Sequence, residues 1–251
     1  MPHPPVNIGE PFITYSRVES TNDEARTAIQ NGLATAGMAF FSSNQVAGRG
    51  QRGRKWWGEP GASLALSIVL QPDFLTVLQQ FELSAALTLG VWDGIASMTG
   101  QDQLRIKWPN DLYWGNKKLG GILIESVISS SGHWSWAIAG IGLNINVQQF
   151  DPSIPNPISL QTITKKSREP MEVAKELIPF IRERIEQLQQ GQVAVQYEAY
   201  QQLLYKRGER VQFKIRDRVS WAVVQGITPK GELRLEGEPK PHSTGSVEWI
   251  Q

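Results

Sequence analysis

The segment from residue 47 to residue 57 contains the residues of this chain that are best suited to bind an anion. It reads AGRGQRGRKWW, and its central seven positions include four cations: Arg49, Arg52, Arg54 and Lys55. The interleaved glycines allow successive backbone N–H groups to converge on one ligand, and the adjacent tryptophans offer flat faces on which a base could stack. The segment therefore predicts a phosphate or carboxylate site, against the alternative of a solvated basic loop. It is not a Walker A loop, because Arg54-Lys55 stands where that motif requires Lys-Ser/Thr.

A second cluster brings two lysines together across a predicted turn. Residues 107–111 read KWPND, and residues 118–125 read KLGGILIE. The proline keeps the residue before it extended and the Asn-Asp step favours a turn, so Lys107 and Lys118 could approach each other across a hairpin. Two cations facing one cleft would neutralise phosphate oxygens or polarise an anhydride. The alternative is an exposed hairpin with solvated lysines, but paired glycines inside an apolar strand indicate close approach of a backbone or a ligand.

Two further segments could bind a polar ligand, and each also has an ordinary structural explanation. Ser20-Thr21-Asn22 precedes a predicted helix, so its hydroxyls and free N–H groups can cap that helix or hold a polar group such as a urea. Residues 140–146 read GIGLNIN, which fits a bulged core strand as well as a strand that lines a ligand. The residues alone leave both segments open.

These segments must be positioned by a fold in which short strands alternate with helices. A helix is predicted over residues 20–32, with Ser20 as its N-cap and Gly32 as its terminator. The other predicted elements up to residue 206 are strands at 38–45, 62–70 (with one polar face), 104–108, 111–114, 118–128 and 133–147, and helices at 75–98 (largely buried), 170–188 and 193–205. The strands between 104 and 147 are too closely spaced for crossover helices, so they should pair antiparallel. Four short strands after Arg207 predict a small SH3-like β-barrel that docks on the main domain.

The composition excludes several classes of protein. The chain has 251 residues, 40% of them hydrophobic and 20% charged, which suits one large globular domain or a core with a small satellite. A net charge of +1 provides no global attraction for nucleic acid or a membrane surface, and the absence of cysteine excludes thiol nucleophiles and iron–sulfur ligation. The three histidines lack metal-site spacing, and no apolar run is long enough to span a membrane. We therefore expect a cytoplasmic protein whose chemistry depends on Lys, Arg and Asp.

In this order, the segments resemble the biotin–protein ligases, also called biotin–[acetyl-CoA-carboxylase] ligases. The resemblance is carried by ESTN at 19–22, QVAGRGQRGRKW at 45–56, KWPND at 107–111, KLGGILIE at 118–125 and GIGLNIN at 140–146. It extends over about residues 12–205, and GITPKGELRL at 226–235 resembles the C-terminal barrel motif of the family. The Arg-Gly segment combined with KWPND is a highly specific pattern.

The resemblance implies an α/β (α+β) fold in two parts. Residues 1–206 would form the catalytic domain, a mainly antiparallel mixed sheet with helices like the core of class II aminoacyl-tRNA synthetases. Residues 207–251 would form the SH3-like barrel. Only about a dozen residues precede the region of resemblance, so we expect the monofunctional type without a DNA-binding domain and predict neither DNA binding nor membrane association. The choice between monomer and homodimer stays open.

The resemblance also implies a reaction and a set of residues for it. Such enzymes form biotinyl-5′-adenylate from the substrates biotin and ATP with Mg²⁺, then transfer biotin to one lysine of the biotin carboxyl carrier protein of acetyl-CoA carboxylase. The implied catalytic residues are Lys118, Arg49, Lys107 and Asp111. The implied biotin-binding residues are Ser20, Thr21, Asn22, Gln45, Gly48, Arg49, Lys118 and Gly121. The implied ATP- and adenylate-binding residues are Arg49, Gly50, Gln51, Arg52, Arg54, Trp56, Asn110, Lys118 and Asn144, with no residue assigned to the metal.

Two departures from the family pattern carry predictions of their own. Gln51 stands where the family often has an arginine, so one cation near the adenylate is missing and we expect looser retention of that intermediate. Thr228 replaces the usual aspartate of the barrel motif, which puts a contribution of the barrel to ATP binding in doubt.

The competing interpretations are a lipoate or octanoate ligase of the same fold and a non-catalytic module that senses biotin or a nucleotide.

Overall fold

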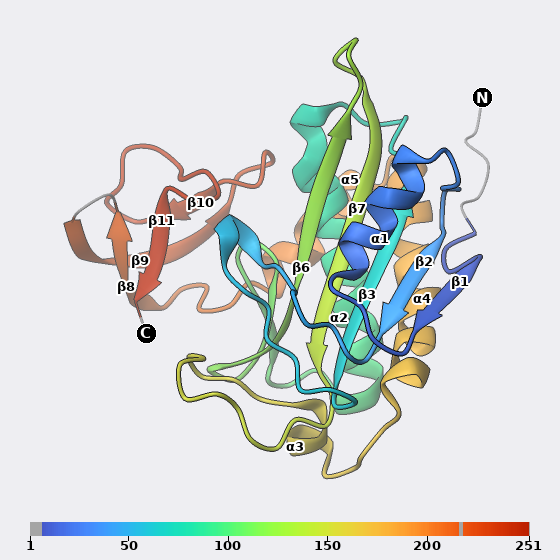
Figure 1. Cartoon of the computed structure of the whole chain (residues 1–251). Helices are drawn as coiled ribbons and strands as arrows, with labels where there is room; N and C mark the ends of the chain where they lie inside the picture. The colour runs from blue at the N-terminus through green and yellow to red at the C-terminus, as the bar shows by residue number, and fades with distance from the viewer. Residues whose placement is uncertain (1–6, 216–217, 251) are drawn as a thin grey trace.

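A seven-stranded mixed sheet forms the centre of the molecule. The computed structural model describes residues 7–215 and 218–250, and the strand order in this sheet is β1-β2-β3-β7-β6-β5-β4 (Figure 1). The strands are β1 (Phe12–Tyr15), β2 (Ala39–Ser42), β3 (Ser63–Leu70), β4 (Leu104–Lys107), β5 (Asp111–Trp114), β6 (Lys117–Ile128) and β7 (Trp134–Asn144). β1 and β2 pair parallel, and the other neighbours in this sheet run antiparallel. The α/β architecture and the antiparallel pairing of β4 to β7 are confirmed.

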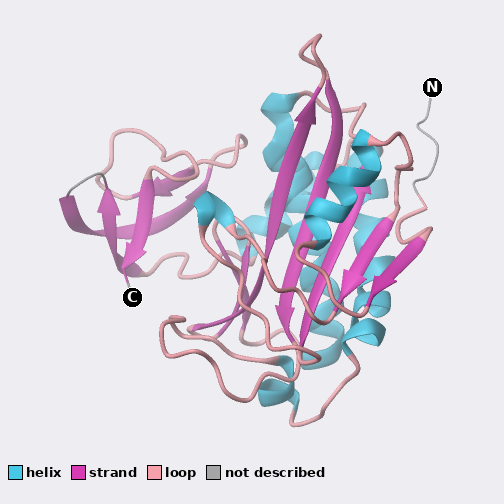
Figure 2. Ribbon diagram, viewed as in Figure 1, coloured by secondary structure: helices cyan, strands magenta, loops and turns pink. Residues whose placement is uncertain are grey.

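Helices cover both faces of this sheet (Figure 2). α1 (Thr21–Gln30) packs on β2, β3 and β7, whereas α2 (Gln80–Thr99) and α4 (Pro170–Gln189) pack against each other on the opposite side (Figure 1). The two long helices approach closely at Gly90, where an added Cβ would lie 2.7 Å from the Cα of Ile181. α3 (Leu160–Thr164) and α5 (Val193–Gln202) complete this layer.

Two details of the predicted elements are wrong. All eight residues of β3 are buried, including Ser63 and Ser67, whereas the sequence predicts one polar face. The reason is that β3 is an interior strand with helices on both sides. The buried helix begins at Gln80 rather than at residue 75, because a separate 3₁₀ turn, Val77–Gln79, precedes it; there the side chain of Gln79 accepts the N–H of Thr76 at 3.0 Å.

The C-terminal strands form a separate antiparallel sheet that docks on the main sheet. β8 (Arg210–Ile215), β9 (Arg218–Ile227), β10 (Leu233–Leu235) and β11 (Val247–Ile250) are arranged in the order β10-β9-β8-β11. The indole N–H of Trp108 donates to the carbonyl of Gly231 at 2.8 Å, and the Tyr197 hydroxyl donates to that of Ile227 at 2.7 Å. These bonds fix the small sheet beside the end of β4. Among the described residues, no helix is both long and apolar enough to cross a membrane.

Candidate active site

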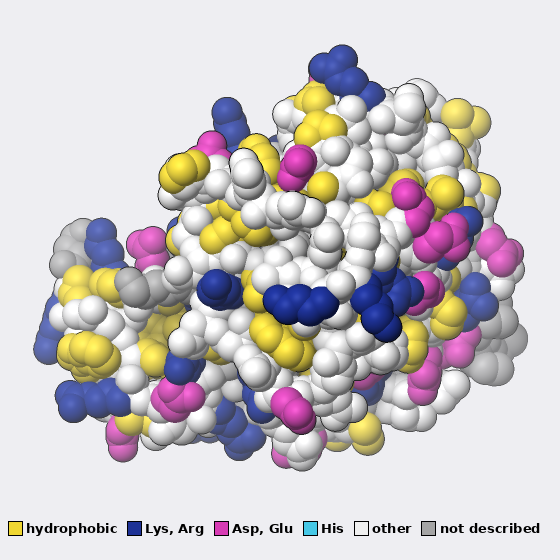
Figure 3. Space-filling model, turned by 90° about the horizontal axis from the view of Figure 1, so that it is seen from below, with side chains coloured by type: hydrophobic (Ala, Val, Ile, Leu, Met, Phe, Trp, Pro, Cys, Tyr) yellow, Lys and Arg dark blue, Asp and Glu magenta, His cyan; other side chains and the backbone are white. Residues whose placement is uncertain are grey.

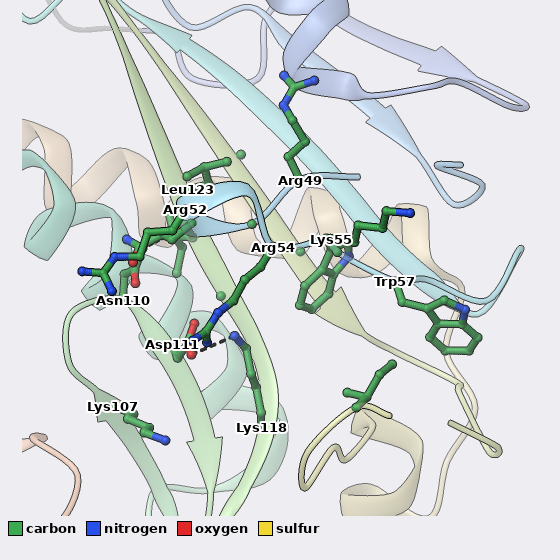
Figure 4. Close-up of a pocket in the computed structure, with 18 of the residues that line it drawn as sticks. Arg49, Arg52, Arg54, Lys55, Trp57, Lys107, Asn110, Asp111, Lys118 and Leu123 are labelled. Atoms are coloured by element: carbon green, nitrogen blue, oxygen red, sulfur yellow. Dashed lines mark hydrogen bonds and ion pairs between the residues drawn. The ribbon is translucent and has the colours of Figure 1, made fainter. Parts of the chain in front are cut away.

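One cavity of about 890 Å³ brings the predicted segments together. It is lined by the start of α1, the segment of residues 49–57, strands β4 to β7, the 150–157 loop and residues 244–249 of the C-terminal sheet (Figure 4). Seen from this end of the main sheet, Lys and Arg side chains form a row across the middle of the face beside hydrophobic side chains (Figure 3). Every residue implied by the sequence lines this cavity except Gly48. Gly48 is buried behind it, where a Cβ would lie 2.5 Å from Nε2 of Gln45.

A chain of polar side chains lies at the α1 end of the cavity. Ser20 occupies the N-cap position of α1, but its side chain makes no capping bond. The cap comes from Gln45, whose Oε1 accepts from both N and Oγ1 of Thr21, at 2.9 and 3.2 Å. Buried Ser67 lies within hydrogen-bond distance of Thr21 Oγ1 and Asn22 Oδ1, at 2.7 and 2.6 Å. This end of the cavity therefore offers several fixed donors and acceptors to a small polar ligand.

Asp111 and Lys118 form an ion pair in the middle of the cavity. The Lys118 Nζ to Asp111 Oδ2 distance is 2.7 Å (Figure 4). The pairing of β5 with β6 places Asp111 opposite Gly121, and a Cβ there would lie 2.6 Å from Asp111 Oδ1. The glycine at 121 is thus required for the carboxylate to occupy its position. Lys118 Nζ also lies 6.0 Å from the ring centroid of Trp56.

Lys107 and Lys118 line the same cavity, as expected, but they do not face each other across one hairpin, and that part of the expectation is wrong. Two successive tight turns produce a three-stranded meander, so β5 lies between the two lysines. Lys107 is buried among aromatic rings, and this burial lowers its pKa from 10.5 to about 8, with Asp111 acting in the opposite direction. Lys107 therefore loses its charge as the pH rises through about 8.

The basic residues of the 49–57 segment point in different directions. Arg49 turns toward α1 and pairs with Asp23 through two bonds of 2.5 and 2.6 Å (Figure 4). Arg54 extends toward Asp111 and lies 3.5 Å from Glu248 of β11. Arg52 packs over Gly245, where there is no room for a Cβ. In this state the cations of the segment do not converge on one anion.

Trp56 and two asparagines are held by the surrounding backbone. The Trp56 indole packs on Gly142, where a Cβ would lie 2.5 Å from Cε2. Asn144 Nδ2 donates to the carbonyl of Ile158 at 3.1 Å, and Asn110 Nδ2 donates to that of Ile122. Both amides are buried. The structure therefore gives each asparagine a local structural partner at the wall of the cavity.

Residues 15–144 match the Biotin/lipoate A/B protein ligase family, which is more than half of the chain. The chain belongs to this family. As a member of the biotin/lipoate ligases, it is similar to two bacterial proteins along most of its length. It is 31% identical to the bifunctional ligase/repressor BirA of Escherichia coli over 92% of this chain and 71% of that protein. It is 32% identical to the biotin–[acetyl-CoA-carboxylase] ligase of Paracoccus denitrificans, covering 88% and 92% of the two chains.

The fold is similar to that of solved biotin protein ligases. The Aquifex aeolicus enzyme in complex with biotin and ATP superposes with a TM-score of 0.79 at 25% identity, over 95% of this chain and 98% of that chain. The Leishmania major enzyme in complex with biotin has a TM-score of 0.65 at 23% identity, over 99% of both chains.

In this biotin/lipoate ligase, several residues at the site had no role in the sequence-based interpretation. Asp23 and Glu125 hold Arg49 and Asn22, and Ser67 supports the α1 end of the cavity. Glu125 ends the KLGGILIE motif, and Asp23 is an acid in the first helical turn, so both carried a weak signal. Besides Tyr113, the rings of Tyr205 and Trp249 lie near Lys107. No sequence pattern connects these two residues with Lys107.

The acidic residues of the cavity do not form a resident metal centre. Among the described residues, no group of three or more His, Asp or Glu side chains could hold a metal ion. Asp111 is the carboxylate in the middle of the cavity, already beside Lys118. Mg²⁺ commonly binds through one or two carboxylates together with substrate phosphates. The residues present therefore fit an ion that arrives with a nucleotide.

Proposed function

We propose that the protein is a biotin–protein ligase. It activates biotin with ATP to biotinyl-5′-adenylate and then transfers biotin to one lysine of a biotin carboxyl carrier domain. One observation carries this proposal: a single cavity joins a polar end, built by Thr21 and Gln45, to a cationic centre at Lys118. The Trp56 indole lies in the same cavity, packed on Gly142 of β7 and near Lys118. The two ends suit the urea-like head and the carboxylate of biotin.

The first step brings two anions together, and the cations of the cavity counter their repulsion. Two unit charges at 4 Å repel by about 4 kcal/mol at an effective dielectric of 20. A biotin carboxylate oxygen attacks the α-phosphorus of ATP, the bond to the bridging oxygen breaks, and pyrophosphate leaves. Lys118 stabilises the charge that develops at this centre, and Lys107 and Arg49 add to it. Mg²⁺ brought in on the ATP phosphates would supply further positive charge, with Asn110 and Asp111 helping to orient the phosphates and the ion.

The remaining residues hold the substrates in the same cavity. Ser20, Thr21, Asn22 and Gln45 bind the ureido ring. Gly48 leaves room for the Gln45 side chain, and Gly121 leaves room for Asp111. Trp56 stacks on adenine, Asn144 lies at its edge, and Asn110 keeps the phosphate side of the cavity in shape. The backbone and side chains of the segment 49–54 cover the adenylate and shield the anhydride from water.

In the second step, a neutral lysine amine of the carrier attacks the acyl carbonyl and AMP leaves. The amine proton passes to Asp111 or to the phosphate. The acceptor is the biotin carboxyl carrier protein of acetyl-CoA carboxylase, the partner implied by the resemblance and by the name of the Paracoccus denitrificans relative. A protomer acting alone or in a homodimer would serve this reaction equally.

We propose a two-part architecture for the chain. We assign residues 1–206 to a catalytic domain like that of class II aminoacyl-tRNA synthetases, supported by its mainly antiparallel sheet backed by α2 and α4. We assign residues 207–251 to an SH3-like barrel, supported by the four short strands β8 to β11. Residues 1–6, 216–217 and 251 of these ranges lie outside the described residues.

Biotin-dependent exchange of pyrophosphate into ATP tests this proposal. We expect exchange with biotin and not with lipoate, and its loss by about two orders of magnitude or more in Lys118→Ala. Measurable biotin binding without exchange would replace the ligase with a sensing module. Exchange with lipoate alone would assign the chain to the lipoate branch instead.

A further inference from the structure

Lys107 lies where the main sheet and the C-terminal sheet meet. It ends β4, and the residue is 8% exposed. Its Nζ donates to the Tyr113 hydroxyl at 3.2 Å and lies 4.7 Å from the Tyr113 ring centroid, 5.4 Å from that of Trp249 and 6.0 Å from that of Tyr205. An ammonium group within about 6 Å of aromatic faces is attracted by the rings, most strongly by Trp. Lys107 is thus enclosed by three rings.

The three rings come from three different parts of the chain. Tyr113 belongs to β5, beside Lys107 in the meander, and Tyr205 follows α5. Trp249 belongs to β11 of the C-terminal sheet and lines the cavity. Its ring is fixed between Phe213 of β8, at a centroid distance of 4.6 Å, and Tyr205, at 5.8 Å. The C-terminal sheet therefore presents one rigid ring to a cation of the cavity.

We propose that Trp249 is a positioning residue for Lys107: its indole holds the ammonium in the cavity and keeps water away from it. The C-terminal sheet then acts directly on the catalytic site rather than only stabilising the fold. The inference rests on the proposed function for its kinetic consequence, because Lys107 is one of the cations expected to act on the phosphates. Its physical part, the shielding of Lys107, stands without that function.

The charges around Lys107 determine how the shielding can be measured. Asp111 favours the charged ammonium, whereas Lys118 and Arg54 oppose it. Burial is the largest influence and lowers the pKa of Lys107 to about 8. Replacing Trp249 by alanine admits water beside the ammonium, so its pKa should rise toward the ordinary 10.5. Loss of the attraction between the ring and the ammonium would lower the pKa of Lys107. This is the smaller effect, because burial is the largest influence on that pKa.

Titration of Lys107 by NMR in protein carrying isotope-labelled lysine tests the shielding directly. The Lys107 signal is assigned by its absence from the Lys107→Arg spectrum. We expect a midpoint near pH 8 in the wild type, a midpoint about one pH unit higher in Trp249→Ala, and a return to the wild-type midpoint in Trp249→Phe, which keeps an aromatic face. Trp249→Thr, which favours a strand, removes the ring and leaves room for water, replaces the alanine variant with the same expected shift if that variant does not fold.

Trp221 provides the matched control. It belongs to β9 of the same small sheet but is 58% exposed, so Trp221→Ala should leave the Lys107 midpoint unchanged. The same midpoint in the wild type and in every Trp249 variant would overturn the inference.

The pH dependence of the exchange kinetics distinguishes a failure of this inference from a failure of the proposed function. The alkaline limb of kcat/KM for ATP in the pyrophosphate-exchange reaction reports groups of the free enzyme, and it should move to higher pH in Trp249→Ala together with the NMR midpoint. If the wild type shows no exchange, the proposed function fails while the NMR titration still decides the role of Trp249. If the wild type exchanges and neither the limb nor the midpoint moves, only the role of Trp249 is rejected.

Discussion

Arg49 and Asp23 form a two-bond ion pair at the rim of the cavity, with N–O distances of 2.5 and 2.6 Å. The pair lowers the pKa of Asp23 and raises that of Arg49. Glu125 adds a second carboxylate 3.7 Å from the same guanidinium. In this state Arg49 is held against α1, away from Lys118. To grip a substrate carboxylate or phosphate, Arg49 must leave Asp23.

Asp23→Asn should therefore increase kcat/KM for adenylate formation. Both side chains are about two-fifths exposed, so the pair is worth no more than about 1 kcal/mol and the increase should not exceed about five-fold. Initial rates of pyrophosphate exchange at low ionic strength measure it. The advantage of the variant should shrink in high salt, which screens the pair. A lower kcat/KM in Asp23→Asn would show instead that Asp23 helps Arg49 to bind substrate.

Substitution of two glycines of β7 should affect the binding of biotin and of ATP separately. A Cβ at Gly140 would lie 2.3 Å from Asn22 Oδ1, and one at Gly142 would lie 2.5 Å from Cε2 of Trp56. We expect Gly140→Ala to raise KM for biotin, and Gly142→Ala to raise KM for ATP, each by about ten-fold, the cost of one lost polar or stacking contact.

Each glycine variant is the control for the other, because both changes add one methyl group to the same strand. Steady-state exchange kinetics with each substrate varied in turn give the four KM values. A rise of both KM values in both variants would indicate a general distortion of β7 and would contradict the assignment of the two ends.

Gln51→Arg should slow the release of biotinyl-5′-adenylate. Gln51 lines the cavity in the 3₁₀ turn Gln51–Gly53, and an added cation there would attract the phosphate of the intermediate. A favourable interaction of about 1 kcal/mol slows release by about five-fold. Rapid filtration of the enzyme–adenylate complex measures the rate. Gln190→Arg, on the exposed end of α4, adds the same charge elsewhere and should not change it.

The segment 49–55 should become protected when its anion is bound. In the free protein its cations are divided between Asp23, Glu248 and the turn at Gly245, so closure over the adenylate requires these contacts to rearrange. Hydrogen exchange should slow in this segment on addition of biotin and ATP, whereas the buried strand β3 serves as the unchanged reference. Equal exchange with and without ligands would reject the closure.

The sequence by itself determined the elements and the clustering of the chemistry. Local signals suffice for this, because a cap residue, a glycine terminator or a closely spaced run of strands acts within a few residues. Thus α1, the meander of β4 to β6 and the C-terminal strands lie near their predicted positions. The resemblance carried by the Arg-Gly segment, KWPND and KLGGILIE likewise implied one site with Arg49, Asp111 and Lys118, and all three line the cavity.

Only the tertiary structure decided which side chains pair and how they are charged. Asp23 and Arg49 are brought together by the packing of α1 on the sheet, and Lys107 meets Trp249 only because the C-terminal sheet docks beside β4. The low pKa of Lys107 has the same origin, since it follows from burial that no neighbour in sequence imposes. Electrostatic energies depend on distance and solvent exposure, and for residues far apart in the chain the complete fold determines both.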